Sequence, residues 1–436
     1  MNFARNATSL LLTSVAGVGI GFVTGIILAR FLSTDDRGAY GVVLTGAEMA
    51  VLLTQVGWGA ASIYRLRRSG AAPDRVVTAA LFLVVAASVF TFAVALPLKP
   101  FLLDRAPPGF PAGAFYAGLF LVPFLLAGTV FSGICRGLDR FAWQNIYQLT
   151  LKAGLLLVLG ILLILLQAGL MMALLGLLAV QIVASLGLFG VVARHTGVAR
   201  RIDFNEVIES AKFGFRNYLQ VLAGQIHERA DILMIAYLVE DNSQVAFYAI
   251  AVSLVALVQL LPESFATALF PKLAGLPEDQ VGPFTARVSR STLFTTLVMV
   301  IGMALISGLF VPFAYGAEYA SSVRPLLILL PAVVFLSIYR VLARYFVSLA
   351  RQTVNIVTQT VSVVVNIGLN LVLIPRHGIA GAAIASVISY GLEAVVIWIA
   401  FARSSGCGFK ETFIPGPSDF LDFRNRLVRA LGRGKS

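Results

Sequence analysis

Residues 225–238 read QIHERADILMIAYL and lie inside an otherwise apolar segment that runs from Phe213 to Val239. Four ionisable side chains fall within five positions of it: His227, Glu228, Arg229 and Asp231. A charged side chain at the centre of a membrane costs roughly 2.5–3.5 kcal/mol on insertion scales, so it faces protein or water rather than lipid. If this segment crosses a membrane, one side of its helix must therefore be polar.

The composition of the whole chain indicates that it does cross a membrane. The 436 residues are 58% hydrophobic and only 12% charged, whereas soluble domains carry about 25% charged residues. This is the composition of an integral membrane protein. The two cysteines, Cys135 and Cys407, form no metal or disulfide pattern, and we expect both to be ordinary small residues.

The apolar segments predict an all-α polytopic membrane protein with twelve transmembrane helices. A membrane-spanning helix needs about 20 mostly apolar residues, and turn-forming clusters such as STDDRG (33–38) and EDNSQ (240–244) separate the candidates. The predicted ranges are 7–31, 38–64, 76–98, 114–135, 144–166, 169–193, 213–239, 244–270, 291–315, 324–349, 354–374 and 378–402.

The net charge of +12 has an explanation that needs no nucleic acid. With the N-terminus placed in the cytoplasm, most of the 33 Lys and Arg residues fall in the cytoplasmic connections and the tail, as the positive-inside rule requires. We therefore expect both termini in the cytoplasm. The tail, 403–436, alternates apolar residues with arginines and predicts a basic amphipathic helix on the anionic inner leaflet. A partly disordered tail is the alternative.

The longest cytoplasmic connection, about 194–212, divides the predicted spans six and six. Residues 27–43 and 235–251 then occupy equivalent places and resemble each other weakly, with Tyr40 matching Tyr248. We therefore predict two pseudo-symmetric six-helix lobes around a central cavity. Transporters built from repeats bind their substrate between the halves, near the bilayer midplane. The predicted boundaries are 1–201 for the first lobe and 202–402 for the second.

Helical spacing places the polar residues of several spans on single faces. In the span from which we began, the residues of one sector about 120° wide are Arg216, Asn217, Gln220, Gly224, His227, Glu228 and Asp231, with Arg229 on its flank. The span 354–374 has a face made of Asn355, Gln359, Ser362, Asn366 and Asn370. Lys152 follows Asn145 and Gln148 on a third face, and an ion pair of Lys152 with Glu48 is the alternative that needs no function. Polar contacts that only hold helices together are the alternative interpretation.

Three arginines favour binding of an anion. Arg340 and Arg344 lie one helical turn apart in the cytoplasmic half of their span, and Arg216 enters its span from the same side. A guanidinium group binds two phosphate oxygens at fixed geometry. A cavity open to the cytoplasm and lined by these three residues is therefore predicted to accept an anionic head group. The alternative is that Arg340 and Arg344 extend to the membrane interface.

The chain has no Walker lysine loop, no dinucleotide glycine motif and no histidine cluster. We therefore expect no cofactor, no bound metal and no catalytic residue, and we interpret the protein as a transporter rather than an enzyme. Active transport would then draw on an ion gradient or on the membrane potential.

Four segments resemble Wzx-type polysaccharide and O-antigen flippases of the multidrug/oligosaccharidyl-lipid/polysaccharide (MOP) exporter superfamily. The segments are LARFLSTDDRGAYGVV (28–43), RADILMIAYLVEDNSQVAFYAIAVSL (229–254), ALFPKLA (268–274) and LARQTVNIVTQTVSVVVNIGLNLVLIPRHGIAGAAIASVISY (349–390). The similarity covers most of residues 1–402. It implies two six-helix lobes around a central cavity, in the bacterial cytoplasmic (inner) membrane.

The resemblance also implies a substrate and a mechanism. The substrate would be an oligosaccharide on polyprenyl pyrophosphate, moved from the inner to the outer leaflet by alternating access coupled to Na⁺ or H⁺. Arg229 and Asp231 occupy the positions of an Arg/Asp pair that such proteins carry in their seventh span. Lipid II flippases resemble this chain but usually have two more spans, which argues against that substrate.

These considerations give the following assignments. The predicted substrate-binding residues are Arg216, Arg340, Arg344, Lys152, Asn355, Gln359 and Asn366. The predicted ion-coupling residues are Glu228, Asp231, His227, Arg229 and Glu48. We expect a monomer whose partners are the lipid-linked oligosaccharide, membrane lipids, a glycan polymerase and glycosyltransferases, with no nucleic acid.

Two other functions stay open. A cation-coupled multidrug antiporter of the same superfamily would need an acidic cavity, which the arginines and the lysine in the spans disfavour. A non-transporting scaffold for glycan assembly would have no use for continuous polar faces inside its helices.

Overall fold

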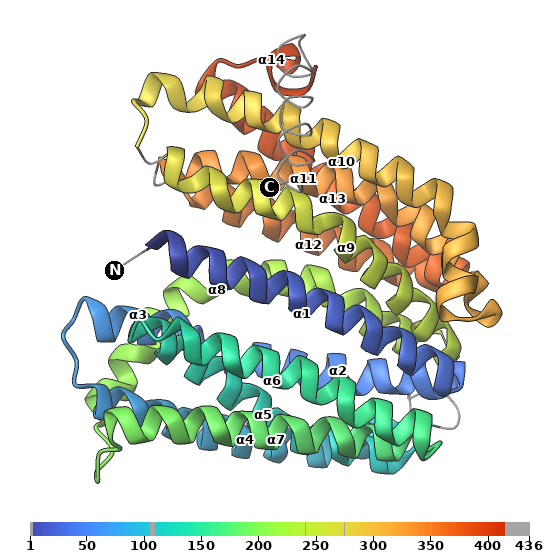
Figure 1. The fold of residues 1–436 in the computed structure, drawn as a ribbon. Coiled ribbons are helices and arrows are strands. Elements are labelled where there is room, and N and C mark those ends of the chain that lie inside the picture. Colours follow the sequence, from blue (N-terminus) through green and yellow to red (C-terminus); the bar gives the residue numbers. More distant parts are fainter. Residues whose placement is uncertain (1–2, 105–109, 240, 274, 350, 415–436) are drawn as a thin grey trace, which may run out of the picture. The chain divides into compact units, whose positions relative to one another are not determined.

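The computed structural model describes residues 3–104, 110–239, 241–273, 275–349 and 351–414. The helix predicted in the tail lies largely outside these residues. Nearly all of the described chain is helical, and it contains no strand. The elements (Figure 1) are α1 (Phe3–Phe31), α2 (Thr34–Thr54), α3 (Trp58–Arg67), α4 (Pro73–Asp104), α5 (Ala112–Gly137), α6 (Phe141–Leu159), η1 (Gly160–Leu165), α7 (Leu170–Thr196), α8 (Phe204–Leu238), α9 (Asn242–Leu273), α10 (Glu278–Tyr315), η2 (Ala317–Ser322), α11 (Val323–Ser348), α12 (Thr353–His377), α13 (Ile379–Ser405) and α14 (Phe409–Phe413).

Each predicted span lies in one helix, with at most one residue outside it, except for two. The span 38–64 is broken into α2 and α3, and the span 144–166 continues from α6 into the π-helix η1. By length and composition, nine helices of the described chain are apolar enough to cross a membrane, or ten if α2 and α3 form one span. The protein is therefore an all-α multi-pass membrane protein, consistent with the twelve predicted spans. α8 is not among the nine, and it is the helix that carries the charges from which the sequence analysis began.

The break between α2 and α3 bends the chain by 45°. Val56 and Gly57 have φ angles of 48° and 66°, in the left-handed region that favours glycine. The backbone of the break also touches α8 closely. A Cβ atom at Gly57 would lie 2.5 Å from the carbonyl oxygen of Gly214, and one at Gly214 would lie 2.4 Å from that of Val56. Glycine is therefore required on both sides of this contact.

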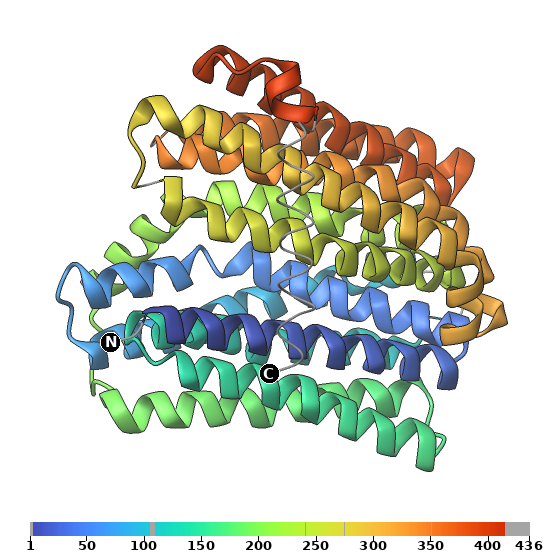
Figure 2. The same cartoon turned by 45° about the horizontal axis from the view of Figure 1, so that its top comes forward.

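The described chain divides into two compact units. Unit 1 comprises 1–249 with 314–318, and unit 2 comprises 250–313 with 319–436, so the division falls inside α9. Within each unit the long helices run side by side (Figure 2). The predicted lobes, 1–201 and 202–402, were defined by a repeat in the sequence. The division into compact units does not test that repeat, so the two lobes stay a prediction.

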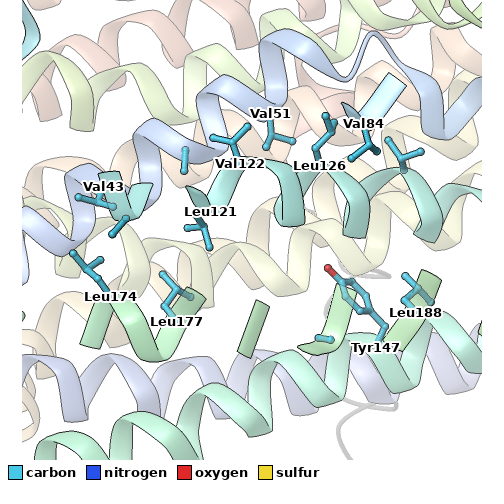
Figure 3. Close-up of a cluster of buried hydrophobic side chains, with 14 of the residues drawn as sticks. Val43, Val51, Val84, Leu121, Val122, Leu126, Tyr147, Leu174, Leu177 and Leu188 are labelled. Carbon is cyan, nitrogen blue, oxygen red and sulfur yellow. The ribbon is translucent and has the colours of Figure 1, made fainter. Parts of the chain in front are cut away.

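The core of unit 1 lies around α5, which packs against α2, α3, α4 and α7. Figure 3 shows Leu121, Val122 and Leu126 of α5 close to side chains of neighbouring helices. Tyr147 lies in the same cluster, and its hydroxyl accepts a hydrogen bond from Gln181 Nε2 at 3.1 Å. A small residue is needed beside this hydroxyl, because a Cβ atom at Gly128 would overlap it.

α8 also packs in unit 1, against α2, α3 and α4. It begins at Phe204, before the predicted span, because the Asp203 side chain accepts hydrogen bonds from the amides of Asn205 and Glu206. Its first turns are held by Glu206, which is 4% exposed and binds Arg65 of α3 with two hydrogen bonds of 2.8 and 2.5 Å. α8 is thus fastened to α3 near its beginning and to the break a few turns later.

In unit 2, α13 packs against both α11 and α12. Tyr345 of α11 and Phe401 of α13 meet edge to face, with ring centroids 4.9 Å apart. α14 packs on the end of α13, where Phe409 and Phe413 lie against Trp398. The two cysteines are free and buried, as expected.

Candidate functional site

The charged residues of α8 do not share one environment. His227 and Asp231 are only 3% and 5% exposed, whereas Glu228 is exposed and Arg229 half-buried. Asp231 accepts a 2.7 Å hydrogen bond from the hydroxyl of Tyr248, which is itself 1% exposed. The polar sector predicted for this helix therefore contains both buried residues, His227 and Asp231, and an exposed one, Glu228.

Arg229 forms an ion pair with Glu48 of α2. The guanidinium also donates from Nε to Gln225 Oε1 at 3.2 Å, one turn earlier on α8. The two charged side chains are 32% and 33% exposed. One cation thus faces one anion, and the pair is neutral.

This pairing rules against the alternative in which Glu48 forms a structural ion pair with Lys152. Among the described residues, no hydrogen bond or ion pair joins the Lys152 ammonium to another group. Lys152 lies on α6 beside α1, where a Cβ atom at Gly17 would lie 3.8 Å from its Cγ and one at Gly21 would lie 3.9 Å from its Nζ. Glycines on α1 leave room for the lysine stem, so the side chain runs along α1 instead of reaching α2.

Unit 2 holds the second cluster, on α9 and α11. Arg340 donates from Nη1 to Glu263 Oε2 at 2.5 Å and from Nη2 to Gln259 Oε1 at 3.3 Å. Arg344 Nη2 lies 3.8 Å from the other carboxylate oxygen, Oε1 of Glu263. Two predicted site residues are therefore brought together, and both turn toward the same carboxylate. The group of two arginines and one glutamate has a net charge of +1.

The polar face predicted on 354–374 exists on α12, and most of it is buried against neighbouring helices. Asn355 donates to the carbonyl oxygen of Ala343 on α11 at 3.1 Å. Asn366 donates to Ser389 Oγ on α13 at 3.3 Å and accepts from Asn370 at 3.1 Å. These contacts hold α12 in unit 2. Gln359 is half-buried, and its Oε1 has no hydrogen-bond partner in the described chain.

Two features were not found from the sequence, and one predicted residue is not described. Glu263 was not among the predicted site residues, although Gln259 lies one turn before it and signals a polar face on α9. Tyr248 was noted only for its match with Tyr40, and it is the partner of Asp231. Arg216 belongs to α8, but its side chain lies outside the described residues.

Comparison with known proteins identifies the family. The model of the polysaccharide biosynthesis protein family matches residues 3–276, and that of the lipid II flippase MurJ family matches residues 154–414. Among curated proteins, the probable low-salt glycan biosynthesis flippase Agl15 of Haloferax volcanii is 22% identical over 414 residues, which cover 91% of this chain and 83% of that protein.

Solved structures show the fold. The lipid II flippase MurJ in an inward closed conformation has a TM-score of 0.77 at 14% identity and covers 96% of this chain and 98% of its own. An inward-facing multidrug resistance transporter of the MATE family, in the MOP superfamily, has a TM-score of 0.72 at 16% identity and covers 89% and 94%. The chain belongs to the polysaccharide biosynthesis protein family, and it is a membrane flippase with the fold of the MOP exporter superfamily.

Proposed function

We propose that this flippase moves an oligosaccharide linked to polyprenyl pyrophosphate from the inner to the outer leaflet. The observation that supports this most directly is the cluster on α9 and α11 in which Arg340 and Arg344 both turn toward Glu263. A pyrophosphate linkage carries negative charge and several acceptor oxygens, which suit two guanidinium groups one helical turn apart.

Further residues have roles in this proposal. Lys152 supplies a cation that no carboxylate of the described chain neutralises, and Arg216 adds another from α8. Sugar hydroxyl groups suit amide side chains, and on α12 Gln359 is half-buried with an Oε1 that has no hydrogen-bond partner in the described chain. Asn355 and Asn366 position it by fixing the helix. Ion coupling by H⁺ or Na⁺ involves the α8 group and its partner, namely His227, Glu228, Arg229, Asp231 and Glu48.

The cellular setting belongs to the same proposal. The protein lies in the bacterial inner membrane as a monomer with both termini in the cytoplasm, and it receives its substrate from glycosyltransferases and delivers it to a glycan polymerase. The matches to MurJ mean that the fold does not separate this substrate from lipid II. The argument for a lipid-linked glycan other than lipid II is that this chain has fewer predicted spans than lipid II flippases usually have.

A multidrug antiporter is the second candidate, because the MATE-family transporter has the same fold. Such a transporter binds cationic compounds, and the positive cluster of unit 2 would repel them. The fold therefore permits this function, but the charge of the cluster disfavours it.

Translocation of a lipid-linked oligosaccharide in reconstituted liposomes tests the proposal. Replacing Arg340→Ala removes a bidentate phosphate ligand and should slow translocation at least about tenfold, the effect of losing one charge-assisted hydrogen bond. Arg324→Ala is the matched control, since Arg324 is an exposed arginine at the start of the same helix. An Arg340→Ala protein that is folded and translocates at the wild-type rate would remove the assignment.

A further inference from the structure

Glu263 occupies both arginines of the unit 2 cluster in this structure. Its two carboxylate oxygens face different guanidinium groups, Oε2 at 2.5 Å from Arg340 Nη1 and Oε1 at 3.8 Å from Arg344 Nη2. Gln259, one turn earlier on α9, accepts a further hydrogen bond from Arg340. An anionic ligand can therefore reach the arginines only in competition with this carboxylate.

The geometry makes Glu263 displaceable. Its side chain is 44% exposed, while that of Arg340 is 19% exposed, so the carboxylate is the outer member of the pair. Its contact with Arg344 is long.

Glu206 of unit 1 shows the opposite arrangement, since it is 4% exposed and binds Arg65 through two short hydrogen bonds. That carboxylate is fixed within the helix packing, whereas Glu263 can leave its arginines without disturbing a core.

We propose that Glu263 is an exchangeable counter-ion. When the substrate binds, its pyrophosphate replaces the carboxylate on Arg340 and Arg344; when the substrate leaves, Glu263 returns. The inference rests on the proposed function and names the group with which the substrate competes.

The exchange serves a purpose in a transporter that must return to its starting conformation without a bound substrate. A guanidinium group that loses a counter-charge among apolar helices is unfavourable. Glu263 supplies a counter-charge to the arginines when no substrate is bound. When the substrate is bound, Glu263 competes with its anion for the arginines and so promotes release of the substrate. A carboxylate in this role should therefore lower affinity and raise turnover.

The experiment compares the purified full chain with its Glu263→Gln variant, which keeps the shape of the side chain and removes its charge. Binding of inorganic pyrophosphate, measured by titration calorimetry, should become about tenfold tighter because the anion no longer competes with a carboxylate. Translocation of the lipid-linked oligosaccharide should become several-fold slower. Glu278→Gln, which removes an exposed carboxylate at the start of α10 in the same unit, should change neither.

Two further variants define the result. Glu263→Ala should give the same tighter binding if Glu263→Gln is poorly folded, and adding Arg340→Ala to Glu263→Gln should abolish the gain. Pyrophosphate binding that is unchanged or weaker in both Glu263 variants overturns the exchange. If the wild type moves no lipid-linked oligosaccharide while Glu263→Gln still binds pyrophosphate more tightly, the proposed function fails and the exchange stands.

Discussion

Units 1 and 2 each contain an ion pair of an arginine with a glutamate. In each unit a glutamine lies one helical turn before one residue of the pair and accepts a hydrogen bond from the arginine. The two groups differ in the number of cations that face the carboxylate. In unit 1 one cation meets one anion, whereas in unit 2 two cations share one anion. The members are Arg229, Glu48 and Gln225 in unit 1, and Arg340, Arg344, Glu263 and Gln259 in unit 2.

The difference teaches that residue types alone do not define a binding site in a membrane protein. The neutral pair of unit 1 joins α8 to α2 and lies near the buried pair of Asp231 and Tyr248. In unit 2 the two guanidinium groups face the carboxylate of Glu263, with which a bound anion would compete. We therefore expect changes in the unit 1 pair to affect stability together with the proposed ion coupling, and changes in the unit 2 cluster to affect mainly substrate binding and transport.

The contact between Gly214 and the α2/α3 break offers the largest effect. Gly214→Ala places a methyl group 2.4 Å from the carbonyl oxygen of Val56, so α8 must move away from the break. We expect a loss of about 3 kcal/mol in the free energy of unfolding, measured by SDS-induced unfolding of the purified protein. Gly46→Ala on α2 is the control, because a Cβ atom there meets nothing within 4 Å. Equal stability of the two variants would show that unit 1 does not hold α8 rigidly.

Asp231 should show the next largest effect. Asp231→Ala leaves the buried hydroxyl of Tyr248 without this acceptor, which should cost about 2 kcal/mol in the same unfolding measurement. Asp231→Asn keeps an acceptor oxygen and should lose clearly less. An Asp231→Ala protein as stable as the wild type would show that the hydrogen bond from Tyr248 does not stabilise α8 in unit 1.

Double-mutant cycles on the two ion pairs provide the smallest effect and the sharpest comparison. The cycle of Glu48→Gln with Arg229→Gln should give a coupling free energy of about 1 kcal/mol, near the upper part of the range for polar contacts in membranes. The cycle of Glu263→Gln with Arg340→Gln should give less, because Arg344 remains beside the carboxylate when Arg340 is removed. A larger coupling in unit 2 would contradict the view that its carboxylate is loosely held.

Apolar length was sufficient to predict where the helices lie, because a membrane-spanning helix has to bury its own backbone hydrogen bonds. The break at residues 55–57 was not predicted. The segment QVGWG (55–59) contains two glycines, but the reason for the break is the close approach of Gly214, which is distant in sequence. A contact of this kind is a property of the tertiary structure.

The site was predicted in part for a related reason. Helical spacing correctly placed Arg340 with Arg344 and the asparagines of α12 with one another, since residues three or four apart share a face. It did not show which helix lies opposite that face. For this reason Lys152 was considered as a partner of Glu48, which in fact pairs with Arg229, and Glu263 was not assigned to Arg340.

The fastening of α8 to unit 1 bears on how the protein is made. With Glu228, Arg229 and Asp231 close together, α8 is not among the helices apolar enough to partition into lipid unaided. A ribosome completes α2 and α3 long before α8, so Glu48 and the glycine of the break are already in the bilayer when α8 leaves the insertion channel, and Tyr248 follows within a few residues. The order of synthesis thus supplies Arg229 with its partner Glu48 at the moment of insertion, and a chain in which α8 preceded α2 would expose that arginine to lipid without a counter-ion.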